Sequence, residues 1–355
     1  MTMDRSTEAA ALGRWLTEKI VGERSVHVDG FATPRSGYSA ETLMVDATVT
    51  SADGARAERF VLRRETADPP IYPTQAPGLD VEIAIQYRAM HSIATHSSVP
   101  IAPLIGYESD SSVLGAPFFV MGFVDGQVPI ENPSYLREGF FHDADPADRR
   151  RLIECGLRVL ADVHRIDWRS ADLDWLNPAG TVPGTARQLA IWEEYARREL
   201  GDRTHPLLDR GLEWLHRHLP PDREVAIAWG DPRPGNMIWR DFTCVCVTDF
   251  EAVSLAPPEY DLGWWLMFDH WSHESMGIAH LAGEPSREEQ RAIYAEALGR
   301  DVGDTHYYEV LAAARYCAIV VRVMNRTVAR GQISADNAIW LENPSTRCLE
   351  MLLES

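Results

Sequence analysis

A change of side-chain pattern along the chain constrains the fold more than any other feature of the sequence. After a predicted helix near residues 6–20, residues 26–64 carry β-branched runs separated by turn residues, which is typical of an antiparallel sheet. Apolar periodicity predicts a helix over 79–96, and two short strands are expected near 102–107 and 117–122. The first part of the chain is therefore expected to be a sheet with a helix packed on it.

From about residue 146 the pattern becomes mainly helical, interrupted by short strands near 225–228, 237–240 and 244–249. The predicted helices span 146–165, 185–200, 204–218, 258–271, 286–300, 305–328 and 334–353. Together these patterns predict an α+β protein of two lobes, an antiparallel sheet lobe and a larger, mostly helical lobe.

The boundary between the two lobes is expected after Met121, where Gly122, Gly126 and Pro129 loosen the chain. This interpretation divides the protein into residues 1–122 and 123–355. A ligand cleft between two such lobes is the expected place for a functional site.

The charge of the chain bears on its partners. It has 34 basic and 53 acidic residues, a formal charge of −19, which repels nucleic acid and anionic membrane surfaces. Such a charge would attract a cationic substrate, although an acidic surface also serves solubility alone. We therefore expect neither a nucleic-acid nor a membrane partner, and the sequence does not specify the oligomeric state.

The cysteines and the N-terminus indicate a reducing compartment. The five cysteines contain no CxxC pair, so neither a disulfide framework nor a cysteine zinc site is indicated, and the histidines show no metal-binding spacing. The N-terminal residues lack an apolar signal core, and the apolar stretches are too short to cross a bilayer. We expect a cytoplasmic protein.

The stretch AIAWGDPRPGNMIWRDFTCVCVTDFE carries the clearest chemical signal. An apolar strand ends in a loop rich in Gly and Pro, and two further strands follow, so that Asp231, Asn236 and Asp249 stand at strand ends. Phosphoryl transfer needs such a set, because it depends on positioning a nucleophile and on Mg²⁺, which prefers carboxylate and amide oxygens. Taken alone, the Gly-Asp-Pro-Arg-Pro-Gly-Asn segment could also be only a turn.

This stretch resembles the catalytic loop of the aminoglycoside phosphotransferase and choline kinase superfamily, whose pattern is HGDxxxxN followed by a strand ending in D-x-E. The resemblance implies a protein kinase-like fold and an ATP- and Mg²⁺-dependent phosphotransferase that acts on a hydroxyl of a small molecule. By the same match Asp231 would face the acceptor hydroxyl, while Asn236 and Asp249 would ligate Mg²⁺. With an ordinary carboxyl pKa near 4, Asp231 would orient the hydroxyl and accept its proton late.

The continuation SLAPPEYDLGW resembles a segment of one branch of this superfamily, the kinase-like domain that is fused to acyl-CoA dehydrogenases. Asp261 in this segment would then brace the catalytic loop from the start of a helix. The resemblance leaves two kinds of acceptor open, an aminoglycoside-like molecule and a hydroxylated acyl group or other small alcohol.

In the first lobe, three further resemblances suggest nucleotide contacts. The GYSAET turn resembles the family's GxSxxT turn, which makes Ser39 a candidate for contacting phosphates. The family has a lysine on its third strand, but the one lysine of this chain is Lys19, so Arg63 is expected to take that place and Arg64 to face outward. Its partner carboxylate would be Glu82, with Gln86 as the alternative register.

The segment FFVMGF resembles the hinge strand that binds adenine through its backbone, so Met121 and Phe123 are candidate nucleotide contacts; an apolar run of this kind could equally be a core strand. His164 matches a family Leu-His position and is expected to be a structural hydrogen-bonding residue. The cluster of Asp269, His270, His273 and Glu274 could line the acceptor pocket or form a solvated helix end.

Two departures from the family pattern keep a second hypothesis open. Trp229 stands where the family has a histidine before Gly-Asp, and the strand lysine is missing. The alternative to an enzyme is therefore a nucleotide-binding pseudokinase or regulatory protein without turnover. Residues 1–122 would then still be the nucleotide-binding lobe, and 123–355 would hold the catalytic loop and the acceptor site.

Overall fold

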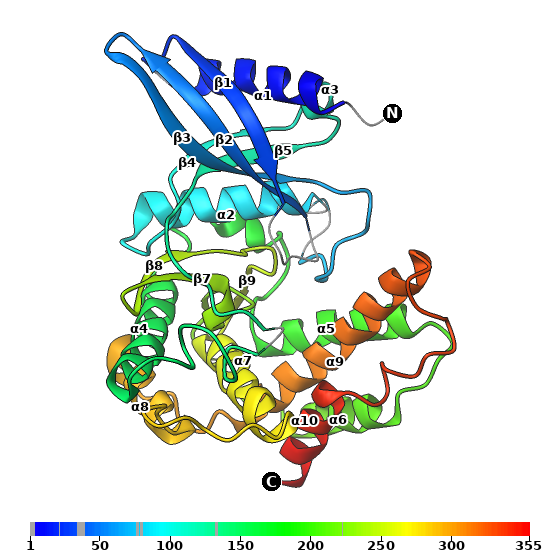
Figure 1. The fold of residues 1–355 in the computed structure, drawn as a ribbon. Helices are drawn as coiled ribbons and strands as arrows, with labels where there is room; N and C mark the ends of the chain where they lie inside the picture. The colour runs from blue at the N-terminus through cyan, green and yellow to red at the C-terminus, as the bar shows by residue number, and fades with distance from the viewer. Residues whose placement is uncertain are drawn as a thin grey trace.

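The computed structural model describes most of the chain, namely residues 4–20, 22–33, 40–75, 78, 81–131, 134–221 and 223–355. Within these residues, five strands form one antiparallel sheet in the order β1-β2-β3-β5-β4, and mainly helical structure follows (Figure 1). The strands are β1 (Ser25–Ala32), β2 (Glu41–Ser51), β3 (Gly54–Arg64), β4 (Leu104–Glu108) and β5 (Phe118–Gly122).

The two faces of this sheet are covered by different helices. Leu12 and Leu16 of α1 (Arg5–Lys19) share a core with Val45 of β2 and with Phe60 and Leu62 of β3. On the other face, α2 (Glu82–His96) packs into the core that also holds Val61, and it lies between the sheet and the helical lobe (Figure 1). Alternate residues of β3 therefore face α1 and the interior between the lobes.

The second lobe carries its strands as two short pairs, β6 (Ala226–Ala228) with β9 (Ser254–Ala256) and β7 (Met237–Arg240) with β8 (Thr243–Val247). The short helix α3 (Ser111–Leu114) lies between β4 and β5 and belongs to the sheet lobe. The α-helices of the second lobe are α4 (Pro146–His164), α5 (Thr185–Leu200), α6 (Pro206–Arg217), α7 (Pro258–His270), α8 (Arg287–Leu298), α9 (His306–Ala329) and α10 (Pro344–Glu354). Short turns of 3-10 helix lie at Asp174–Leu176 and Pro234–Asn236, and a π-helical turn, η3, spans Trp271–Ser275.

The predicted fold class is confirmed, and two local predictions were wrong. The helix expected over 334–353 begins only at Pro344, because Asn343 caps it and Pro344 occupies its first position. The strand β9 was missed: three residues are too few to show a periodic pattern, and this segment is a strand only through its pairing with β6. In the described part of the chain, no helix combines the length and apolar character needed to span a membrane.

Candidate active site

The loop that follows β6 is held by a buried aspartate of α7. Asp261 is fully buried, and its Oδ2 and Oδ1 accept the backbone N–H groups of Trp229 (2.6 Å) and Gly230 (3.1 Å). Gly230 has φ +96°, and a Cβ there would lie 2.3 Å from Ala252 O, so this turn requires glycine. His164 Nε2 lies 3.1 Å from Asp261 Oδ2, which confirms the structural roles expected for both side chains.

Trp229, which replaces the family histidine, is also part of the framework of the loop. Its ring is fully buried and lies 5.9 Å from Phe250, centroid to centroid. Its indole N–H donates to the backbone oxygens of Thr248 (2.8 Å) and Asp249 (3.1 Å). The tryptophan therefore ties the loop after β6 to the strand end that carries Asp249.

Asp231 lies in a buried pocket of hydrogen-bond donors. Trp264 Nε1 donates to its Oδ1 (2.8 Å), and Asn236 Nδ2 donates to its Oδ2 (2.8 Å). Arg233 Nε lies 2.9 and 3.1 Å from the two carboxyl oxygens, and the Tyr72 hydroxyl donates to Oδ2 at 3.1 Å. Four side chains from three segments thus fix the orientation of this carboxyl group.

Burial nevertheless changes the acidity of Asp231. Loss of hydration and, to a smaller extent, the nearby charge of Asp249 raise its pKa to about 7, although the hydrogen bonds from Trp264 and Asn236 favour the charged form. The ordinary value near 4 that the sequence suggested was therefore wrong. A carboxyl group with a pKa near neutrality can accept a proton more readily at physiological pH.

Asn236 and Asp249 come together beside Asp231. Thr248 joins them, because its N–H (3.0 Å) and hydroxyl (2.9 Å) both donate to Asn236 O. The side-chain Nδ2 of Asn236 donates to Asp231. The other polar atom of this amide group, Oδ1, is an acceptor of hydrogen bonds or a possible metal ligand. Asp249 has φ +58°, an unfavourable backbone conformation of the kind that clusters at functional sites.

The donor atoms at this place suit a hard divalent cation. Asn236 offers an amide oxygen and Asp249 a carboxylate, and the carboxylate of Asp231 lies close by. Mg²⁺ in phosphate-binding sites is commonly held by one or two such protein oxygens, while water and phosphate supply the other ligands. Asn236 and Asp249 therefore fit the metal that the resemblance implied.

Arg63 reaches this group of residues from β3. Its Nη1 lies 2.9 Å from Asp249 Oδ1, and its Nη2 lies 3.8 Å from Glu251 Oε2. Burial lowers the pKa of Arg63, but the nearby carboxylates of Asp249, Glu251 and Glu82 together outweigh it and raise this pKa above its usual range. Arg63 thus points into the cleft between the lobes, as the alternation of β3 predicted.

The helix α2 contributes both candidate partners to this network. Burial raises the pKa of Glu82, which shares a hydrogen bond with Glu251. Gln86 Nε2 donates to Glu251 Oε2 at 3.3 Å. The two residues that the sequence treated as alternatives therefore meet on one carboxylate, Glu251, to which the sequence reasoning had given no role.

The neighbouring arginine, Arg64, lies on the opposite face of the sheet from Arg63, as expected, but it does not face solvent. It bonds Glu41 and Glu8 (Nη1 to Oε1, 2.6 Å), and Glu8 belongs to α1. The side chain is largely buried because α1 covers this face of the sheet.

The remaining nucleotide candidates have different outcomes. Ser39 lies outside the described residues. Met121 is buried near the end of β5, paired with Val61 of β3, and Phe123 is exposed. The N–H of Phe123 donates to Arg59 O (3.1 Å), so its use for adenine would require that bond to be exchanged.

A pocket opens beside the catalytic loop, on the side of α7. Its lining includes Arg233 and Gly235 of the loop, and Phe268, Asp269 and His273 of α7 and η3. Because Arg233 lines this pocket and also contacts Asp231, the pocket adjoins the carboxyl group of Asp231.

Four residues in or next to the site were missed by sequence reasoning: Tyr72, Arg233, Glu251 and Trp264. Glu251 and Trp264 stand in the D-F-E and D-L-G-W segments, so the motifs themselves carried a usable signal. Arg233 lies within the loop. Tyr72 had no local signal, because it reaches Asp231 from a segment 159 residues away.

The chain has a kinase-like fold. Residues 32–308 match the family model described as "Phosphotransferase enzyme family", and the chain belongs to that family.

Among individual relatives, mouse acyl-CoA dehydrogenase family member 11 is 26% identical over 315 residues, covering 85% of this chain and 37% of the mouse protein. The chain thus spans little more than a third of that relative. Among solved structures, a Ralstonia eutropha protein provisionally described as an aminoglycoside phosphotransferase is 25% identical with a TM-score of 0.68, covering 97% of this chain and 95% of that one. A ternary complex of aminoglycoside phosphotransferase APH(4)-Ia with ADP and hygromycin B shares the fold at 12% identity, with a TM-score of 0.54 over 97% of this chain and 98% of that one.

Proposed function

We propose that this protein transfers the γ-phosphoryl group of ATP to a hydroxyl group of a small molecule, with Asp231 as the residue that faces the acceptor. The observation that carries the proposal is the convergence of Asp231, Asn236 and Asp249, with Arg63 reaching the same place from the sheet lobe. The family membership of the chain supports the same reaction class.

In this proposal each side chain has a distinct task. Asp231 orients the acceptor hydroxyl and accepts its proton; the Tyr72 hydroxyl already makes a hydrogen bond of this kind to Asp231 Oδ2. Asn236 and Asp249 hold Mg²⁺, which neutralises charge on the phosphates when bound. Arg63 binds phosphate as a fork of N–H donors in place of the family lysine.

The acceptor is expected in the pocket beside α7. Hygromycin B is bound by the structural neighbour APH(4)-Ia, and the dehydrogenase-fused relatives make a hydroxylated acyl or other alcohol the second class of acceptor.

A transfer assay tests the proposed function directly. The full chain, labelled ATP and Mg²⁺ are incubated with a panel of aminoglycosides, hydroxyacyl compounds and other alcohols, and labelled product is separated from ATP. Acceptor-dependent transfer that requires Mg²⁺ is the expected result. Binding of ATP without transfer to any acceptor, and without hydrolysis, would contradict the proposal.

One contact favours the second candidate function, a nucleotide-binding protein without turnover. The Arg63 guanidinium is paired with Asp249 Oδ1, an atom that the proposed mechanism assigns to the metal. If this ion pair persists when nucleotide binds, ATP would bind without Mg²⁺-dependent transfer. A rise in melting temperature with ATP that Mg²⁺ does not increase would support this candidate.

Replacing Arg63 is expected to weaken ATP binding selectively. Arg63→Met removes the charge that faces the phosphates and should raise the KM for ATP by about tenfold or more, since charge-assisted hydrogen bonds are lost. Arg63→Lys keeps the positive charge but lacks the two-pronged guanidinium group, so its KM for ATP should lie between those of the wild type and Arg63→Met. Arg64→Met is the matched control, because Arg64 faces α1 on the other side of the sheet. Equal effects of the two Met variants on the KM for ATP would refute the assignment.

The pKa of Asp231 predicts how activity depends on pH. Because burial raises this pKa to about 7, the carboxyl group is protonated, and unable to accept a proton, below neutrality. We expect log kcat/KM to rise with a slope of about one up to pH ~7 and to level off above it. Initial rates across this range check the prediction, which a flat profile between pH 5.5 and 8 would contradict.

A further inference from the structure

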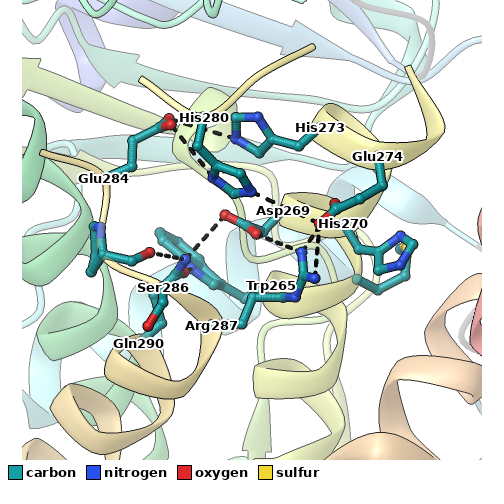
Figure 2. A network of polar contacts seen from close by, with 12 residues as sticks. Trp265, Asp269, His270, His273, Glu274, His280, Glu284, Ser286, Arg287 and Gln290 are labelled. Atoms are coloured by element: carbon teal, nitrogen blue, oxygen red, sulfur yellow. Dashed lines mark hydrogen bonds and ion pairs between the residues drawn. The ribbon is translucent and has the colours of Figure 1, made fainter. Parts of the chain in front are cut away.

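A second polar cluster lies at the far end of α7, in and after the turn η3 (Figure 2). Asp269 and His273 stand four residues apart on this helical segment, and His280 and Glu284 follow in the next loop. In Figure 2, dashed lines join Glu284 to both histidines, while Asp269 lies beside His280 and is joined to Arg287 and Gln290. The spacing of the histidines alone had given no sign of this arrangement.

The cluster brings nitrogen and oxygen donors together. Asp269, His273 and His280 each offer one ligand atom, and these three atoms lie within 4.8 Å of one another. Glu284 adds a fourth donor, with its oxygens 3.6 Å from His273 Nε2 and 3.6 Å from His280 Nδ1. Donors that share a tetrahedral ion lie about 3.4 Å apart, so the two contacts of Glu284 with the histidines stand close to that spacing, whereas Asp269, His273 and His280 would have to move closer together around an ion.

The surroundings orient these donors as the outer shell of a metal site does. His273 Nδ1 lies 3.1 Å from Ile278 O, which places the N–H on Nδ1 and leaves the Nε2 lone pair for the cluster. Asp269 is fixed by Gln290 Nε2 (3.0 Å) and Arg287 Nη1 (3.1 Å). Ligating carboxylates are commonly held in this way.

Burial and charge also favour a cation. The Glu284 side chain is only 5% exposed and that of His273 only 3%, so both groups have lost most of their hydration. The two imidazole rings are stacked, with centroids 3.7 Å apart, an arrangement that disfavours two positive charges on the rings themselves. A bound cation can offset the Glu284 carboxylate while both rings stay neutral.

We propose that Asp269, His273, His280 and Glu284 bind a divalent transition-metal ion of the Zn²⁺ type. Two imidazoles with two carboxylates form a mixed set that suits Zn²⁺ better than Mg²⁺, which prefers oxygen donors alone. Asp269, His273 and Glu284 also line the pocket beside the catalytic loop, so the ion lies in the wall of that pocket. This inference stands on the cluster and does not depend on the proposed phosphotransferase activity.

Metal binding to the purified full chain tests this inference. Zn²⁺ titration by calorimetry, in buffer with millimolar Mg²⁺ to occupy sites of oxygen donors, is expected to give one saturable site per chain. Co²⁺ in place of Zn²⁺ should give the visible absorption bands of a tetrahedral nitrogen and oxygen site. Absence of saturable Zn²⁺ binding would overturn the proposal and leave the histidines as partners of Glu284 only.

Variants locate the ion. His280→Ala should weaken Zn²⁺ binding by at least about tenfold, and this side chain is 43% exposed, so the fold should tolerate its loss. His216→Ala is the matched control, because His216 is also exposed and pairs with a glutamate, Glu193, at 3.0 Å. Asp249→Ala should leave Zn²⁺ binding intact. Binding lost in Asp249→Ala but kept in His280→Ala would place the ion at the catalytic loop and refute the cluster.

Discussion

Asp231→Asn is expected to lower kcat by about 10²–10⁴-fold, because the amide cannot accept the proton of the acceptor hydroxyl. The KM for ATP should stay within about threefold of the wild type, since Asp231 faces the acceptor and not the nucleotide. Steady-state kinetics with an acceptor found in the transfer assay measure both constants. A variant that retains wild-type turnover would remove Asp231 from the mechanism.

The same substitution should make the protein more stable at high pH. The folded protein holds a proton on Asp231 up to about pH 7, while the unfolded chain loses it near pH 4, so the contribution of Asp231 to stability falls as pH rises between these values. Above pH 7 the buried carboxylate is charged and costs stability, which neutral Asn avoids. We expect a gain on the order of 2 kcal/mol at pH 8 and a smaller gain at pH 5.

Thermal unfolding of both proteins at the two pH values checks this second effect. The control is Asp202→Asn, which changes an exposed aspartate and should leave the melting temperature nearly unchanged. Equal stability of wild type and Asp231→Asn at both pH values would show that Asp231 has an ordinary acidity.

Asp249→Ala is expected to abolish Mg²⁺-dependent turnover, with a loss on the order of 10³-fold. The variant removes the carboxylate proposed to hold the metal and also the 2.9 Å ion pair of Arg63. Any rise in melting temperature that Mg²⁺ adds to that of ATP should disappear as well. Kinetics and thermal shift at varied Mg²⁺ measure the two effects.

The chain offers a matched control for this experiment. Asp241 also has a positive φ, +50°, in the exposed turn between β7 and β8, so Asp241→Ala imposes a similar backbone strain. It should leave turnover nearly unchanged. A comparable loss of activity in the two variants would attribute the effect of Asp249→Ala to folding and would contradict a metal-binding role.

The fold and the centre of the site could be predicted from the sequence because their signals are local. The period-2 runs of 26–64 and the helical periods after residue 146 each reflect one element's own buried face. The same alternation, together with the resemblance of this strand to the family, directed Arg63 into the cleft, and the resemblance of the stretch that holds Asp231, Asn236 and Asp249 indicated their convergence. Errors arose where the local pattern was short, as at β9, or where a cap decided the boundary, as at Asn343.

Other features of the site depend on segments that are distant in the sequence. Glu82 and Gln86 meet Glu251 because α2 packs over the segment that follows β8. No periodicity in the sequence specifies this packing. Tyr72 approaches Asp231 across the lobes, and the closing of the cluster around Glu284 depends on a loop that folds back onto η3.

The sequence by itself determined which residue types stand at the strand ends and which face of each element they share, because these properties follow from backbone periodicity. Only the tertiary structure decided how strongly each group is dehydrated and which charges surround it. The pKa of Asp231 near 7 is the clearest case. Acidity depends on solvent and neighbouring charges in three dimensions, and the order of residues along the chain does not specify either.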